Sequence, residues 1–126
     1  TVETVDWFIS NNYDLNVHSV ASIYNVNVLD QLNKFCQSKK LIQKCVLVDG
    51  PEYMMPRNLP VQVKEKLKKR LEKDKNDAII NTVIKELSTP GNFDVFVEND
   101  NKMNELRNEH WKHANPELYK LLTGYL

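Results

Sequence analysis

Two short apolar runs that flank one amphipathic helix pattern constrain the fold of this chain most. The runs cover residues 19–26 and 45–51, and each ends in polar or turn-forming residues. Between them, Asn27 is a good N-cap for a helix, and one face of that helix is lined by Val28, Leu29, Leu32, Phe35 and Cys36. A strand, a helix and a second strand in this order predict a βαβ unit, whose strands must run parallel. The strands are expected at about 18–24 and 44–48.

Ligands of parallel α/β folds bind at the carboxyl ends of the strands. A functional site is therefore expected first at Tyr24-Asn25-Val26 and at 49–53, where the two runs end. Asp49 and Glu52 lie there and could serve in acid–base chemistry. Formation of the Asp-Gly-Pro turn is the simpler interpretation of these carboxylates.

Composition restricts the function classes. The 126 residues suit one domain, and 17 Lys+Arg balance 17 Asp+Glu, so net charge attracts neither nucleic acid nor anionic membrane. No apolar stretch approaches the ~20 residues of a membrane span, and no signal peptide opens the chain, so the cytoplasm is the expected location. The chain begins at Thr1 without Met, so we expect it to be trimmed, processed or part of a longer protein.

The second half of the chain has the periodicity of helices throughout. Apolar stripes are formed by Val63, Leu67 and Leu71, by Ile79, Ile80, Val83, Ile84 and Leu87, by Phe93, Phe96, Val97, Met103 and Leu106, and by Leu118, Leu121 and Leu122. The basic residues between Lys64 and Lys75 lack interleaved aromatic residues, which favours a solvated helix face over nucleic-acid binding. The fold is thus predicted to be α/β, with a βαβ portion over 1–58 and a helical extension over 59–126.

A sheet of only two parallel strands is not self-sufficient, because parallel strands are normally covered on both faces and flanked by others. Either the N-terminal residues supply a further strand, or missing sequence, a partner chain or helices cover the edges.

Other candidate sites have simpler explanations. His110 and His113 could share a helix face with Glu109 or Glu117 as a further zinc ligand, but no zinc motif supports this. Arg107 is interpreted as bracing a helix junction. Cys36 and Cys45 are expected to be buried thiols.

Several short motifs, in this order, resemble radical SAM proteins of the twitch type. Ser22-Ile23-Tyr24-Asn25-Val26 is followed by Val48-Asp49-Gly50-Pro51-Glu52-Tyr53 and then by Asn58-Leu59-Pro60 before a charged helix. Asn104-Glu105-Leu106-Arg107-Asn108 is similar to the Leu-Asp-x-x-Arg-like segment of that family. Pro116-Glu117-Leu118 with Leu121-Leu122 resembles its closing Pro-Glu-Leu motif. The resemblance extends from about His18 to the end of the chain.

The resemblance implies that this chain corresponds to the last two strands of a partial (β/α) barrel and a C-terminal helical extension. It also implies that S-adenosylmethionine lies across the carboxyl ends of the strands. Of the candidate cofactor-binding residues, the ribose or substrate side would be bordered by Tyr24, Asn25 and Val26. The adenine would be bordered by Val48, Gly50, Pro51 and Tyr53.

The CxxxCxxC motif that holds the [4Fe–4S] cluster in that family is absent, and two isolated cysteines cannot replace it. We therefore expect a C-terminal segment that shapes the cavity for S-adenosylmethionine and substrate and is inactive alone, with a cluster domain as the missing partner. The alternative is a non-catalytic interaction module. Its helical half would dock on a partner protein or a second copy through the stripes at 79–87 and 93–97.

Overall fold

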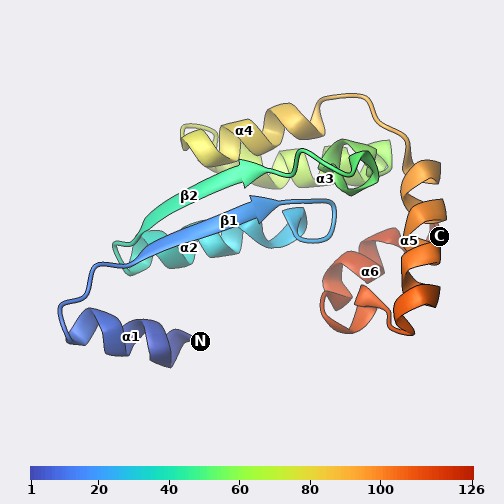
Figure 1. The fold of residues 1–126 in the computed structure, drawn as a ribbon. Coiled ribbons are helices and arrows are strands. Elements are labelled where there is room, and N and C mark those ends of the chain that lie inside the picture. The colour runs from blue at the N-terminus through green and yellow to red at the C-terminus, as the bar shows by residue number, and fades with distance from the viewer.

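The computed structural model describes residues 1–126, which form six α-helices and one two-stranded parallel sheet (Figure 1). The strands are β1 (Asn16–Ala21) and β2 (Ile42–Leu47). The helices are α1 (Val2–Ser10), α2 (Leu29–Ser38), α3 (Val61–Leu71), α4 (Ala78–Leu87), α5 (Phe93–Arg107) and α6 (Pro116–Leu122). Short 3₁₀ turns occupy Val26–Val28, Glu52–Met54, Pro56–Asn58, Glu72–Asp74 and Trp111–His113. The mixed α/β class and the parallel strand–helix–strand order are as predicted.

The first strand ends earlier than predicted, and the side chain of Asn25 explains why. Its Oδ1 accepts from the Ser22 N–H at 2.9 Å, and its Nδ2 donates to the Val20 carbonyl at 2.8 Å. These bonds fold the chain into a turn directly after Ala21. The prediction that Asn27 caps the next helix was wrong, because Asn27 is buried inside a 3₁₀ turn and Val28 takes the N-cap position.

Only one face of the sheet is covered by helices. Cys45 and Leu47 point toward the core, and α2 and α4 contact β2 on that side. On the opposite face the exposed fractions are 50% for Val20, 61% for Ile42 and 62% for Val46. The N-terminal residues form α1, which lies near the amino ends of the strands (Figure 1), so they supply no third strand. Both outer edges of the sheet are therefore unpaired.

A single apolar core joins residues from both halves of the chain. It lies between the covered sheet face and the helices, and its members are Ala21, Ile23, Val26, Leu29, Leu59, Val63, Leu67, Leu71, Ile80, Val83, Leu87, Phe96, Leu118 and Leu122. The core thus draws on both sides of the expected boundary between 58 and 59. Leu106 was expected on the apolar face of its helix, but it is 80% exposed because it lies outside the stripe.

The prediction of a solvated basic face was wrong for two of its members, Lys64 and Arg70. Lys64 is buried, and its Nζ donates to the carbonyls of Arg57 at 3.0 Å and Thr89 at 3.1 Å. Burial, reinforced by the charge of Lys68, lowers the pKa of this ammonium group. These bonds attach α3 to the loop before it and to the end of α4.

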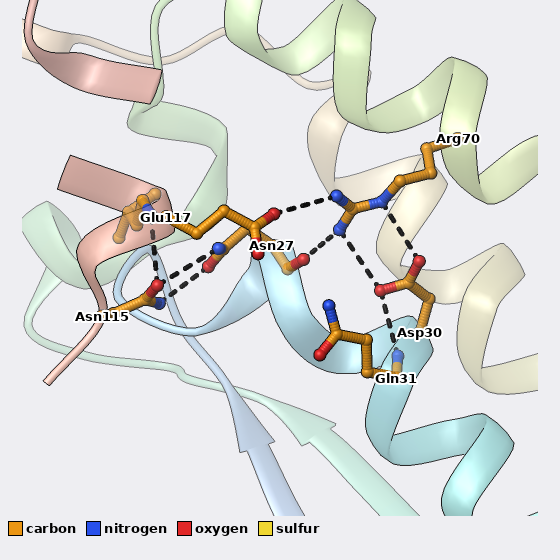
Figure 2. A network of polar contacts seen from close by, with 7 residues as sticks. Asn27, Asp30, Gln31, Arg70, Asn115 and Glu117 are labelled. Carbon is orange, nitrogen blue, oxygen red and sulfur yellow. Dashed lines mark hydrogen bonds and ion pairs between the residues drawn. The ribbon is translucent and has the colours of Figure 1, made fainter. Parts of the chain in front are cut away.

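Arg70 connects three helices through the network in Figure 2. Its guanidinium donates to the Asn27 carbonyl and pairs with the carboxylates of Asp30 at 3.1 Å and Glu117 at 3.2 Å. Asn115 donates from Nδ2 to Asn27 Oδ1 at 2.8 Å in the same network. The start of α2, the end of α3 and the start of α6 are thereby fixed to one another.

Polar groups also fix the loop that follows β2. The buried carboxylate of Glu86 accepts from the backbone N–H of Arg57 at 2.9 Å and from its Nε at 3.0 Å and Nη2 at 2.8 Å. Asn58 donates from Nδ2 to the Glu52 carbonyl at 2.6 Å, and its Oδ1 accepts from the Asn92 N–H at 2.9 Å. This loop therefore has a definite shape at the carboxyl edge of the sheet.

We predict that Gly91→Ala destabilises the chain by about 1–3 kcal/mol, the usual effect of overpacking. A Cβ atom at Gly91 would lie 2.1 Å from the Arg57 carbonyl oxygen and 2.8 Å from the Asn58 nitrogen, both backbone atoms. Gly124→Ala is the matched control, since a Cβ there meets nothing within 4 Å. Urea denaturation measures both, and equal midpoints for the two variants would contradict the close packing of this loop against 89–92.

Candidate functional site

A cavity of about 390 Å³ lies at the carboxyl edge of the sheet, between the segments that follow β1 and β2 and the end of α5. Figure 1 shows the strand arrows pointing toward α5 and α6. The cavity is lined by Tyr24, Tyr53, Met54, Asp100, Met103, Asn104, Arg107, Glu109, His110, Trp111 and Ala114. Aromatic and thioether groups therefore form most of its walls, with a few charged groups among them.

The buried carboxylate of Asp100 is the polar centre of this cavity. Its Oδ1 accepts from the Tyr24 hydroxyl at 2.7 Å, and its Oδ2 accepts from Trp111 Nε1 at 2.9 Å and from Asn104 Nδ2 at 3.1 Å. Asp100 is only 3% exposed, so an unpartnered charge here would be strongly unfavourable. Three donors from three parts of the chain stabilise it and fix the two aromatic rings.

Backbone contacts hold Tyr24 in this position. The Ile23 N–H donates to the Met54 carbonyl at 2.7 Å, which joins the segments following the two strands. Asn115 Nδ2 donates to the Tyr24 carbonyl at 2.8 Å. The Tyr24 ring also packs edge-on against Phe96 and Trp111, with centroid distances of 5.5 and 6.0 Å.

A sharp reversal at the end of α5 returns Trp111 to the cavity. Asn108 adopts the left-handed conformation with φ 51°, which asparagine tolerates better than most residues. His110 then caps the next turn, because its Nδ1 accepts from the Lys112 N–H at 2.9 Å. A neutral His110 consequently carries its proton on Nε2 and can donate a hydrogen bond from that atom.

The environment of Tyr24 opposes ionisation of its hydroxyl. Burial raises its pKa far above the ordinary value, and the hydrogen bond to Asp100 and the charge of that carboxylate act in the same direction. The charge of Arg107 opposes these effects more weakly. Tyr24 is therefore a neutral donor and not a proton acceptor.

Two of the predicted site residues, Tyr24 and Tyr53, do meet at the cavity. Asn25 does not line it, since its side chain shapes the turn after β1. Val26 is fully buried in the core.

The remaining predicted residues follow β2 but lie outside the cavity lining. The Val48 N–H donates to the Ala21 carbonyl at 2.9 Å and extends the strand pairing. Gly50 and Pro51 are exposed, and a Cβ built on Gly50 would meet nothing within 4 Å. Gly50 and Pro51 form an exposed rim of the loop that leads to Tyr53 in the cavity.

His110 and Arg107 both line the cavity, whereas His113 does not. His110 lines the cavity, but His113 is exposed, and the segment is a 3₁₀ turn rather than the expected α-helical face. No three His, Cys, Asp or Glu side chains gather as a metal site. The prediction that Arg107 braces a helix junction was wrong, because its side chain takes part in none of the ion pairs and lines the cavity instead.

The two cysteines also differ from each other. Cys36 is buried as predicted, and burial raises the pKa of its thiol. Cys45 is only half-buried, so the prediction was wrong for this residue. Its Sγ lies beside the core on the covered face of β2.

Sequence reasoning missed Asp100, although a signal for it exists. Asp100 lies four residues after Phe96 and seven after Phe93, in phase with the apolar stripe of α5. A charged residue at such a position is buried only with specific partners. The tyrosine and tryptophan that supply those partners are far away in sequence or beyond the helix end.

No family model, curated protein or solved structure with which the chain was compared matches it. Among its helices, none combines the length and the apolar character needed to cross a membrane.

We predict that Tyr24→Phe lowers the free energy of unfolding by about 1.5–3 kcal/mol at neutral pH, the range for a hydrogen bond to a charged group. In the wild-type chain, stability falls as pH rises above about 10, because the unfolded phenol ionises there while the folded one stays protonated. In Tyr24→Phe, this contribution to the decrease in stability at alkaline pH is absent.

Denaturation at a series of alkaline pH values measures this effect. Tyr13→Phe is the control, since the Tyr13 side chain is 57% exposed in a loop at the other end of β1. Identical alkaline slopes for the wild type and Tyr24→Phe would contradict a half-buried Tyr24 that stays protonated through its bond to Asp100.

Proposed function

We propose that this chain is the C-terminal segment of a radical SAM-type enzyme and shapes the cavity for S-adenosylmethionine and substrate. The observation that carries the proposal is the meeting of Tyr24 and Tyr53 at a cavity on the carboxyl edge of two parallel strands. These two residues come from two of the motifs that carry the family resemblance. In parallel α/β folds this edge is where ligands bind.

The uncovered part of the sheet gives independent support. The sheet has two unpaired edges and one exposed face, which carries Val20, Ile42 and Val46 together with Asn16, His18 and Lys44. Both features are unusual for a parallel sheet that stands alone. The preceding strands of a partial barrel would pair with the free edge of β1, and their curvature would enclose the bare face. Residues 1–126 then supply one part of a larger enclosed site.

The residues at the edge fit an adenosine group in part. Tyr24 and Tyr53 supply aromatic surface for a flat purine. Gly50 and Pro51 leave the rim beside them open. Asn25 and Val26 do not fit the role carried over from the family, because one is engaged in a turn and the other is buried in the core.

The chain's own cysteines do not fit a [4Fe–4S] cluster. Cys36 lies on α2 and Cys45 on β2, whereas such a cluster is held by several thiolates in close spacing. Any radical chemistry under this proposal therefore depends on a separate cluster domain. The contribution of this chain is limited to binding and orienting a ligand and excluding water from it.

The alternative function is a non-catalytic interaction module. The helical stripes at 79–87 and 93–97 were expected to dock on a partner. They are largely unavailable for this, because Ile80, Val83, Leu87 and Phe96 lie inside the core of the chain. The bare sheet face is the surface that remains for such docking.

We predict that 5′-methylthioadenosine, which carries the nucleoside and sulfur of S-adenosylmethionine without its amino-acid group, binds the chain. Tyr53→Ala should weaken the binding about tenfold through the loss of base stacking, and Tyr13→Ala should leave it unchanged. Isothermal titration calorimetry measures the three dissociation constants.

Absence of binding, or equal weakening by both substitutions, would refute the proposed nucleoside site. Binding of the nucleoside by a chain that stays monomeric in sedimentation would also count against the interaction-module alternative.

A further inference from the structure

We infer that the cavity beneath the rim takes the zwitterionic head group and apolar side chain of a free α-amino acid. This inference deepens the proposed function, because it names the substrate class that would lie beside the nucleoside. It depends on three features of the cavity: its charged groups, its apolar walls and its size.

The charges available to a ligand are one cation and one carboxylate. Arg107 and Glu109 both line the cavity and are exposed, and neither takes part in an ion pair with the other or with any further residue. Asp100 already accepts three hydrogen bonds inside the cavity. An α-amino acid matches this pair, with its carboxylate toward Arg107 and its ammonium group toward Glu109.

The walls favour an apolar or aromatic side chain. Trp111, Met54 and Met103 contribute a ring and flexible thioethers. The thioethers can adapt to side chains of different shape. His110 can add a hydrogen bond from Nε2, because its Nδ1 is engaged as an acceptor.

The size of the cavity is sufficient for an amino acid. Its volume of about 390 Å³ lies at the lower end of ligand pockets, which span roughly 300–1,000 Å³. A free amino acid occupies only part of that space, and the exposed Gly50 and Pro51 before Tyr53 leave the neighbouring edge open for a nucleoside. The two ligands are therefore assigned to adjoining places.

The test compares three probes that differ only in their charged groups: L-phenylalanine, 2-phenylethylamine without the carboxylate, and 3-phenylpropanoate without the ammonium group. In calorimetric titrations of the full chain, we expect L-phenylalanine to bind at least about tenfold more tightly than either analogue. Arg107→Gln should weaken the binding of L-phenylalanine about tenfold and leave the affinity for 2-phenylethylamine unchanged. Glu109→Gln should weaken the binding of L-phenylalanine and leave the affinity for 3-phenylpropanoate unchanged.

Lys102→Gln is the matched control, because Lys102 is an exposed cation on α5 that pairs with Glu98 and does not line the cavity. Arg107 and Glu109 are surface residues without ion-pair partners, so their substitution should leave the fold intact, and circular dichroism checks this. Equal affinity for all three probes would overturn the inference, as would 2-phenylethylamine binding as tightly as L-phenylalanine, which would indicate a cation site.

The outcome separates the two proposals. Binding of L-phenylalanine without binding of 5′-methylthioadenosine would uphold the amino-acid site and refute the nucleoside site. The reverse result would uphold the nucleoside site and overturn the inference.

Discussion

The buried carboxylate of Asp100 is the group on which the candidate site depends. It takes hydrogen bonds from Tyr24 after β1, from Trp111 beyond α5 and from Asn104 within α5. A desolvated charge of this kind is tolerated only when its partners are in place, so the position of each ring is coupled to the others. Together with the Asn115 bond to the Tyr24 carbonyl, these bonds attach the C-terminal helices to the carboxyl edge of the sheet, and the cavity lies between the joined parts.

A second constraint is that helices cover only one of the two faces of the sheet. Helices cover one face, and the polar networks around Arg70 and Glu86 connect these helices and the loop after β2 to one another. The other face carries exposed aliphatic side chains at Val20, Ile42 and Val46. The proposed place of this chain at the end of a larger barrel accounts for both observations. In such a barrel the helix-covered face of the sheet would lie on the outside, and the exposed face would line the interior.

The local patterns predicted the elements well and the polar contacts poorly. Parallel pairing followed from the apolar runs around Ile23 and Leu47, and the stripes of α4 and α6 were evident from helical spacing. Periodicity does not reveal partners distant in sequence. Lys64 appeared solvent-facing although two carbonyls bind it, and Asn25 appeared ligand-facing although its amide closes a turn. Tyr24 and Tyr53 line one cavity because the topology brings the strand ends together.

A double-mutant cycle on Tyr24→Phe and Asp100→Ala tests the central claim most directly, with unfolding free energies measured by urea denaturation. If their hydrogen bond joins α5 to the carboxyl edge of the sheet, the two effects should be non-additive by about 1.5–3 kcal/mol. Effects that add to within about 0.5 kcal/mol would mean that the two groups do not interact in the folded chain, and would contradict the attachment of α5 through this hydrogen bond.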